Sequence, residues 1–251
     1  MKKCAIVTGG ASGIGRACVD ALINEGHDVV IADLNAEAGE LAAQELGATF
    51  IQTDLSKRES CKQLVDETIK LFGKVDILVN NGGYQHVSSL EDFPEDTWDN
   101  MIKVLLTAPF LLTKYVWPSM KTQQWGRIVN IASIHSEIAS LHKGAYISAK
   151  HGLIGLTRTA ALEGGDAGIT VNALSPAYVK TALVENQIED LSRTKNISKE
   201  DVVEKVMLEP AAIKRLIEPE EVANLVILLC SDKGATITGA NWKIDCGWTA
   251  K

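Results

Sequence analysis

The stretch Cys4–Gly15 reads C-A-I-V-T-G-G-A-S-G-I-G and joins a short apolar run to a glycine-rich turn. Cys4–Val7 predicts a buried strand, and the residues after the turn predict an amphipathic helix to about Glu25. Together they form a phosphate-binding pattern, because glycines let the backbone approach a pyrophosphate and the first helical amides favour negative charge. The spacing is G-x-x-x-G-x-G, not the G-x-G-x-x-G of most dinucleotide folds. We predict that the phosphates are held by Gly9, Ser12, Gly13, Ile14 and Gly15.

The segment Asp28–Asp33 reads D-V-V-I-A-D and predicts an apolar strand that ends in an acid. Asp33 follows the glycine turn by about twenty residues, where a carboxylate accepts hydrogen bonds from the ribose of an adenosine. Asp33 would repel a 2′-phosphate, and neither Ser12 nor Leu34 supplies a cation to bind one. The sequence therefore favours NAD over NADP, with a solvated acid at a strand end as the alternative.

Helix and strand patterns alternate along the remaining chain, which is typical of an α/β fold with a doubly wound parallel sheet of the Rossmann type. One predicted strand is followed by Thr53-Asp54-Leu55 and the next by Asn81-Gly82-Gly83. The carboxyl ends of such strands line one crevice, where ligands bind. We expect Asp54 to accept from the adenine amino group, with Leu55 beside it, and Asn81 to lie beside the nicotinamide ribose.

No linker, repeat or low-complexity segment interrupts the chain, so we expect a single dinucleotide-binding and catalytic domain over residues 1–251. The segment from Thr97 to about Met120 predicts a long helix that Pro109 bends. Residues 181–208 are more polar and predict two helices over the crevice. We expect this segment to act as a small substrate lid.

The segment Ser133–Lys150 carries the pattern of a proton-transfer site. Tyr146 and Lys150 are four residues apart, so on a helix they lie one turn apart on one face. A tyrosine hydroxyl titrates near about pH 10, and a lysine ammonium close by favours the phenolate and lowers that pKa. Ser133 follows a predicted strand and is placed to hydrogen-bond a substrate oxygen. The pattern favours proton transfer at an alcohol or carbonyl, although isolated Tyr-x-x-x-Lys pairs are common on helices.

Composition restricts the class of partner and the compartment. A net charge of −7 argues against nucleic acid and an anionic membrane as partners. The five cysteines lack C-x-x-C spacing, which favours a reducing cytoplasm over a disulfide framework. We expect no metal, because His135, His142 and His151 match no zinc pattern. We also expect no signal peptide and no membrane-spanning segment. Ser133 is not on a G-x-S-x-G turn, which argues against a hydrolase.

The motifs occur in the order found in the short-chain dehydrogenase/reductase family, which the chain resembles over essentially its whole length. The matching residues are Thr8–Gly15, Asn80–Gly83, Ser133, Tyr146 with Lys150, and the turn at Pro176. The resemblance implies a doubly wound fold, NAD(P) across the strand ends and hydride transfer at a secondary alcohol or ketone. It implies that Tyr146 is the general acid/base, that Ser133 positions the substrate oxygen, and that Lys150 binds the nicotinamide ribose and lowers the pKa of Tyr146. It also places Val179 at the cofactor and suggests a homotetramer built on the long helices.

The segments expected to face the substrate resemble the bacterial D-3-hydroxybutyrate dehydrogenase subfamily. They are Tyr84–Val87 with Glu91–Pro94, Ala132–His135, Lys143–Gly152, Leu183–Ile188 and Gly247–Ala250. The resemblance implies that the substrate carboxylate is held by Gln85, His135, Lys143 and Gln187. It implies that Tyr178 and Trp248 close a small pocket in which Ser133 and Tyr146 contact the hydroxyl. A short hydroxy acid does need several donors a few ångströms from its hydroxyl site. Taken singly, each of these residues is equally typical of a structural or solvated position.

Three features depart from the family pattern. Leu105 stands where the family carries an asparagine assigned to a water-linked proton relay that reaches the lysine. The backbone carbonyl at this position can still hold the water, but a leucine side chain cannot, so we expect weakened proton exchange. Gly82 replaces the usual alanine, with an expected small loss of rigidity. Ala177 and Cys246 stand where glycine is common, which predicts strain wherever φ is positive.

Three functions are compatible with these residues. The leading hypothesis is an NAD-dependent dehydrogenase that interconverts (R)-3-hydroxybutyrate and acetoacetate. The enzymatic alternative is a reductase of a sugar, polyol or 3-oxoacyl substrate, which keeps Ser133, Tyr146 and Lys150 but needs no carboxylate site. The third, motivated by Leu105 and Gly82, is an NAD-binding sensor without turnover.

Overall fold

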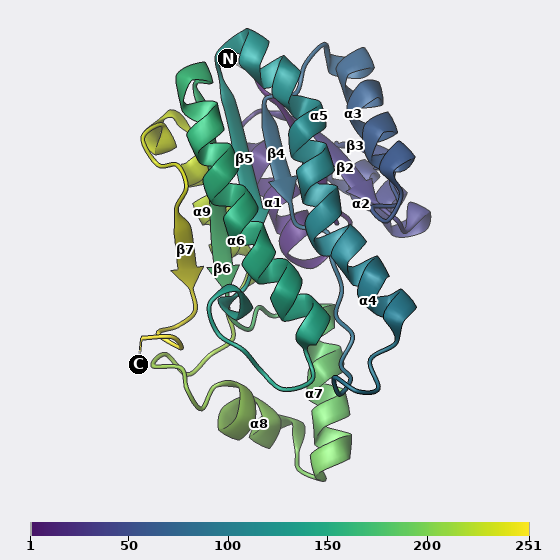
Figure 1. Cartoon of the computed structure of the whole chain (residues 1–251), viewed down its shortest axis with the longest axis vertical. Coiled ribbons are helices and arrows are strands. Elements are labelled where there is room, and N and C mark those ends of the chain that lie inside the picture. Colours follow the sequence, from purple (N-terminus) through teal and green to yellow (C-terminus); the bar gives the residue numbers. More distant parts are fainter. Residues whose placement is uncertain (1, 251) are drawn as a thin grey trace.

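The computed structural model describes residues 2–250, apart from the side chains of residues 190 and 194, and contains a seven-stranded parallel sheet (Figure 1). The strand order is β3-β2-β1-β4-β5-β6-β7. The chain leaves β1 in one direction along the sheet and returns through β4 in the other, so the sheet is doubly wound and has its switch point between these two strands. The predicted fold class is confirmed. The strands are β1 (Cys4–Thr8), β2 (Asp28–Asp33), β3 (Thr49–Gln52), β4 (Ile77–Asn80), β5 (Gly126–Ile131), β6 (Ile169–Pro176) and β7 (Asn241–Ile244).

Helices cover both faces of the sheet. On one face lie α1 (Gly13–Asn24), α2 (Ala36–Leu46) and α9 (Pro219–Cys230), and on the other α3 (Arg58–Phe72), α5 (Ala108–Gln123) and α6 (Gly144–Gly164) (Figure 1). The remaining helices are α4 (Glu95–Ile102), α7 (Ala182–Lys195) and α8 (Lys199–Val202). Short turns are η1 (Lys103–Thr107), η2 (Ile134–Ser136), η3 (Gly165–Ala167), η4 (Val203–Met207) and η5 (Asp232–Gly234).

Strands β1 to β6 contribute side chains to two apolar cores, one on each face of the sheet, whereas β7 contributes only to the core under α1 and α9. In β1, Ala5 and Val7 face the helices α1 and α9, whereas Ile6 faces α3 and α5. This alternation follows from the two-residue period of a strand, and both faces are apolar because both are covered. A fully buried side chain of this size contributes about 1.5–3 kcal/mol. The rigid core holds the carboxyl ends of β1, β4 and β5 in register, and these ends carry the site.

The helix predicted over Thr97 to Met120 is divided in two by a π-helical turn. α4 ends at Ile102, η1 spans Lys103–Thr107, and α5 begins at Ala108. Pro109 lacks an N–H group, so the carbonyl of Leu105 has no i+4 donor and the regular helix cannot continue through this point. The regular α-helical pattern is therefore interrupted just before Pro109, and the bend itself stays a prediction.

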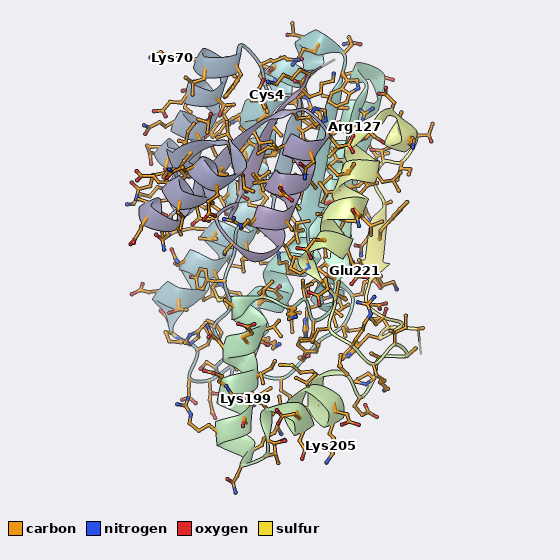
Figure 2. All side chains as sticks on the ribbon, turned by 180° about the vertical axis from the view of Figure 1, so that it is seen from behind. Cys4, Lys70, Arg127, Lys199, Lys205 and Glu221 are labelled. Atoms are coloured by element: carbon orange, nitrogen blue, oxygen red, sulfur yellow. The ribbon has the colours of Figure 1, made fainter. Side chains whose placement is uncertain are left out.

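The segment 181–208 forms the two expected helices, beyond the carboxyl ends of the strands (Figure 1). Val184, Ile188, Val202 and Met207 pack together in a small apolar cluster of their own. Figure 2 shows Lys199 and Lys205 of this segment at the opposite end of the molecule from Cys4 and Lys70. The role of the segment 181–208 as a lid stays a prediction.

Within residues 2–250, no helix combines the length and the apolar character needed to cross a membrane.

Candidate active site

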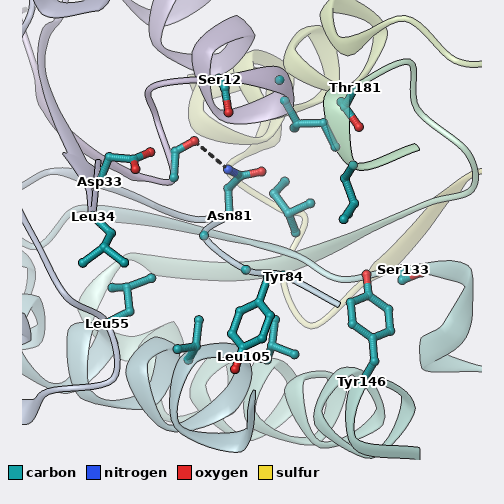
Figure 3. A pocket seen from close by; sticks show the side chains of 18 of the residues that line it. Ser12, Asp33, Leu34, Leu55, Asn81, Tyr84, Leu105, Ser133, Tyr146 and Thr181 are labelled. Atoms are coloured by element: carbon teal, nitrogen blue, oxygen red, sulfur yellow. Dashed lines mark hydrogen bonds between the residues drawn. The ribbon is translucent and has the colours of Figure 1, made fainter. Parts of the chain in front are cut away.

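A cleft of about 740 Å³ lies at the carboxyl ends of the central strands (Figure 3). It is lined by every predicted cofactor residue except Gly15, and by the three predicted catalytic residues. These lining residues are Gly9, Ser12, Gly13, Ile14, Asp33, Asp54, Leu55, Asn81, Ser133, Tyr146, Lys150 and Val179. Residues 9 and 179 are far apart in the chain, so the fold brings the predicted cofactor set into one cleft.

The glycine turn between β1 and α1 is shaped for close approach. Gly9 and Gly13 have φ of 62° and 53°, a backbone conformation that glycine adopts without strain. A Cβ at Gly15 would lie 2.0 Å from the carbonyl oxygen of Gly9, so this glycine lets α1 pack against the turn instead of lining the cleft. Ser12 is the N-cap of α1 and its side chain makes no capping bond. The first amides of α1 are therefore available to an anion.

Polar side chains fix the other cleft walls. The Asp33 carboxylate accepts from the backbone N–H of Ala11 at 3.2 Å and of Asn35 at 3.1 Å, which holds it beside the glycine turn. Hydrogen bonds from Ser56 lower the pKa of Asp54. Asn81 donates from Nδ2 to the carbonyl oxygens of Thr8 and Gly9, at 2.9 and 3.2 Å. The bond from Asn81 to the glycine turn is dashed in Figure 3.

Gly82 has a steric role here. A Cβ at this position would lie 2.6 Å from Cδ1 of Leu55 and 3.3 Å from the backbone nitrogen of Gly9. The absence of a side chain allows Leu55 to enter the cleft wall beside the glycine turn. The close contacts with Leu55 and Gly9 therefore explain why a glycine stands at position 82. The sequence alone did not show this reason.

Ser133 and Tyr146 face each other across the end of β5 (Figure 3). Ser133 is the N-cap of η2, and its hydroxyl oxygen accepts from the backbone N–H of His135 at 3.2 Å. Three residues after Ser133, the hydroxyls of Ser136 and Ser175 lie 3.0 Å apart and tie this loop to β6. Lys150, one turn after Tyr146 in α6, donates from Nζ to the carbonyl oxygen of Ile131 at 2.6 Å. Its Nζ lies 5.6 Å from the centre of the Tyr146 ring.

Burial governs the protonation of this group. It raises the pKa of Tyr146, and the hydrogen bond with Ser133 opposes that rise. Burial also lowers the pKa of Lys150 to about 8. The lowered pKa expected for Tyr146 is therefore not produced by the protein groups alone. A positive nicotinamide ring in the cleft would act in the required direction, since an opposite charge favours the phenolate.

Leu105 is buried at 1% exposure in η1 and packs with Met101, Ala145 and Ala149. Its side chain offers no donor or acceptor to the cleft. The π-helical turn supplies a different feature, because Pro109 deprives the carbonyl of Leu105 of an i+4 donor. The side-chain part of the expected relay is therefore absent, and the backbone part stays a prediction.

The remaining predicted substrate residues do not line the cleft. Gln85 and Gln187 are brought together by a hydrogen bond of 3.0 Å. Trp248 donates from Nε1 to the carbonyl oxygen of Met207, and Tyr178 packs against the α7–α8 cluster. The buried His135 ring lies edge-on to Tyr146, with the ring centres 6.1 Å apart. Lys143 is half-buried at the start of α6, close enough for its charge to lower the pKa of His135.

The comparisons with known proteins agree with this geometry. A family model described as enoyl-(acyl carrier protein) reductase matches residues 9–249. The chain is 46% identical to an uncharacterized oxidoreductase, YxjF, of Bacillus subtilis (strain 168), over 100% of this chain and 99% of that one. It is 42% identical to a D-beta-hydroxybutyrate dehydrogenase of Rhizobium meliloti (strain 1021), over the full length of both. The chain belongs to the short-chain dehydrogenase/reductase family. The crystal structure of gox2181 superimposes with a TM-score of 0.91 at 30% identity, over 100% of this chain and 96% of that one.

Short-chain dehydrogenases/reductases typically use NAD or NADP, and the cleft fits such a dinucleotide. The glycine turn leaves a cradle beside the free amides of α1, which suits a pyrophosphate. Asp33 and Lys150 both line the cleft, as the binding of two ribose groups would require. These residues of the chain itself would hold the cofactor.

Sequence reasoning gave no individual role to several residues that line the cleft. Tyr84 accepts a 2.6 Å hydrogen bond at its hydroxyl from Nδ2 of Asn100, and both residues line the cleft beside Leu105. Thr181 also lines it, and its Cγ2 would lie 3.1 Å from a Cβ at Gly13. Tyr84 directly follows the glycine pair at the end of a predicted strand, and this position was a signal that it lies at the cleft. No local pattern pointed to Asn100.

Proposed function

We propose that this oxidoreductase transfers a hydride between NAD and a short 3-hydroxy acid, with (R)-3-hydroxybutyrate and acetoacetate as the pair. The proposal rests chiefly on Lys143. Lys143 is half-buried, burial lowers the pKa of its ammonium, and none of the described carboxylates is paired with it. A desolvated cation without a partner is costly, so such a site favours an anionic ligand. The substrate carboxylate would supply that charge.

Gln85 supports the same proposal. Its Oε1 accepts from Gln187, whereas its buried Nε2 has no acceptor among the described residues. Buried polar groups are normally hydrogen-bonded, so this N–H is matched to a ligand atom that accepts. A carboxylate between Lys143 and Gln85 would satisfy both donors.

The preference for NAD rests on Asp33. Its carboxylate is fixed at the glycine turn, and the next side chain, Leu34, is 64% exposed and apolar. An adenosine ribose with free hydroxyls would donate to Asp33, whereas a 2′-phosphate would be repelled.

We also propose, from the family resemblance, that the protein is a cytoplasmic homotetramer. Light scattering measures the number of subunits in the assembly.

The residues of the chain divide the chemistry among them. When bound, the cofactor accepts the hydride from the carbinol carbon. Ser133 holds the substrate oxygen beside Tyr146, and Tyr146 takes the hydroxyl proton. Lys150 binds the nicotinamide ribose and favours the phenolate. Each group lies at the cleft, so no step requires a residue from elsewhere in the chain.

The test is the initial rate of NADH formation from (R)-3-hydroxybutyrate and NAD, with the (S) enantiomer and NADP in parallel. We expect turnover only with the (R) acid and a strong preference for NAD. In Lys143→Met, the KM for the acid should rise about 10- to 100-fold, the effect of losing a charged hydrogen bond. Oxidation of a neutral secondary alcohol should not change in this variant. Lys70→Met, at the far end of the molecule (Figure 2), is the matched control.

An unchanged KM in Lys143→Met would refute the carboxylate site and favour a reductase of a sugar, polyol or 3-oxoacyl substrate. NAD binding without turnover on any alcohol would instead favour the sensor. The two outcomes are distinguished by whether a broad alcohol panel yields NADH.

A further inference from the structure

Both ring nitrogens of His135 have a serine hydroxyl as partner. Nδ1 lies 3.4 Å from Oγ of Ser133, and Nε2 lies 2.8 Å from Oγ of Ser140. The Ser133 and Tyr146 side chains face each other in the cleft (Figure 3). Hydrogen bonds therefore link Ser140, His135 and Ser133, and the Ser133 end of this chain faces Tyr146. The contact to Ser133 is long, as such bonds often are before substrate binds.

The chain runs from the protein interior toward its surface. His135 is 6% exposed and Ser133 is 7% exposed, whereas Ser140 is half-buried. Burial is the main cause that lowers the pKa of His135 to about 4, and the charges of Lys143 and His151 lower it further. His135 is thus neutral at working pH, with one N–H donor and one acceptor nitrogen.

The neutral ring has two tautomers, and they orient the Ser133 hydroxyl differently. Oγ of Ser133 already accepts from the backbone N–H of His135. If Nδ1 also carries a proton, Oγ accepts a second bond and its own proton must point toward Tyr146 or the substrate oxygen. If Nε2 carries the proton instead, the Ser133 proton points to Nδ1 and Oγ can only accept from Tyr146. The Ser140 hydroxyl can pair with Nε2 in either tautomer, because by rotating it either donates to the unprotonated nitrogen or accepts from the N–H group.

We propose that His135 and Ser140 are positioning residues that set the direction of the Ser133 hydroxyl, with the Nδ1–H tautomer accompanying the Tyr146 phenolate. In that state Ser133 donates to the oxygen that bears negative charge. When Tyr146 is protonated, the ring proton lies on Nε2 and Ser133 accepts. This assignment rests on the proposed acid/base role of Tyr146, and it does not depend on the identity of the substrate.

The first test is ¹⁵N NMR of histidine-labelled protein with NAD bound and without substrate, with the His135 signal assigned by His135→Gln. We expect His135 to stay neutral from pH 6 to 10 and to shift toward the Nδ1–H tautomer as pH rises through the ionisation of Tyr146. The shift should disappear in Tyr146→Phe. A tautomer that is independent of pH, or that behaves identically in Tyr146→Phe, would overturn the proposal.

The second test is the pH profile of kcat/KM for alcohol oxidation in Ser140→Ala. Loss of one hydrogen bond should weaken phenolate stabilisation about three- to tenfold, which moves the acidic limb of the profile to higher pH. We expect a smaller effect on KM than on kcat. Ser148→Ala, an exposed serine on α6, is the control and should leave the profile in place. A Ser140→Ala profile that coincides with that of the native protein would overturn the proposal.

The two tests separate this inference from the proposed function. If the protein does not oxidise 3-hydroxybutyrate, the NMR result stands unaffected, and the profile can be measured with any alcohol it accepts. If His135 only binds the substrate carboxylate, His135→Gln raises KM for the acid and leaves the acidic limb unchanged. That outcome would contradict the positioning role while leaving the proposed substrate intact.

Discussion

Gln187 on α7 donates a hydrogen bond from Nε2 to Oε1 of Gln85, at 3.0 Å, although 102 residues separate the two in the chain. The bond joins the predicted lid to the loop that follows β4. It also fixes the orientation of the Gln85 amide, since Oε1 faces Gln187 and the buried Nε2 is left with no acceptor among the described residues. One contact therefore links α7 to the loop after β4 and sets which atom Gln85 presents to a ligand.

Gln187→Leu should raise the KM for the hydroxy acid about tenfold and lower kcat less, because Gln85 loses its orientation and the lid loses a polar anchor. Steady-state kinetics with (R)-3-hydroxybutyrate measure this split. Asn186→Ala, an exposed neighbour on the same helix, is the control. A Gln187→Leu enzyme with native KM would show that the bond plays no part in substrate binding.

Lys150→Met should abolish turnover and yet stabilise the protein at neutral pH. Burial lowers the pKa of Lys150 from its ordinary 10.5 to about 8. Between these values the unfolded chain holds a proton that the folded chain has released, so the free energy of unfolding rises with pH in this window. At pH 7 the buried charge costs stability, on the order of 1–3 kcal/mol.

Thermal unfolding at pH 7 and pH 10 measures the effect of Lys150→Met. The gain in Tm over the native protein should be larger at pH 7, because native Lys150 is already neutral in the folded state at pH 10. Lys70→Met, which replaces an exposed lysine, should change Tm little at either pH. If the Tm of Lys150→Met at pH 7 is equal to or lower than that of the native protein, burial of the Lys150 charge does not cost the stability proposed.

Leu105→Asn should lower stability and raise kcat. The buried leucine packs against Met101 and Ala149, and replacing it with a polar group costs about 2–4 kcal/mol. The asparagine would restore a polar side chain to the relay position, for a gain in kcat of about tenfold or less. Leu106→Asn, one residue on, should lose stability without that gain. A kcat of Leu105→Asn equal to that of the native protein would refute the expected weakening of proton exchange.

Cys246→Gly should stabilise the protein by about 0.5–1 kcal/mol, because Cys246 has a φ of 55°. The strain predicted from the sequence is thus confirmed at this position. Ala177 is not among the described residues with positive φ, so Ala177→Gly should destabilise the protein by a similar amount. Urea unfolding of the two variants compares them directly. Stabilisation by both substitutions, or by neither, would contradict this assignment.

Much of the fold followed from local pattern. The apolar runs ending at Thr8, Asp33 and Asn80 predicted three strands correctly, because buried parallel strands are apolar on both faces. Pro109 predicted the break between α4 and α5, since the missing N–H is a property of one residue. The glycine spacing of residues 9–15 predicted the turn, because the backbone freedom of glycine is likewise a property of single residues.

The site could be predicted only in part. The order of Ser133, Tyr146 and Lys150 indicated the catalytic group, and the structure brings all three to one cleft. The reason for Gly82 lay in its contact with Leu55, and the pairing of Asn100 with Tyr84 joined residues on separate elements. Neither contact leaves a signal in the spacing of nearby residues.

The sequence by itself determined the doubly wound sheet and the order of the cofactor and catalytic residues, because these depend on hydrophobic period, glycine and proline, which act over a few neighbouring residues. The tertiary structure alone decided the pKa direction of Tyr146, the partners of both His135 nitrogens and the contact between Gln85 and Gln187. These depend on desolvation and on hydrogen-bond geometry between distant segments, which exist only once the chain has folded.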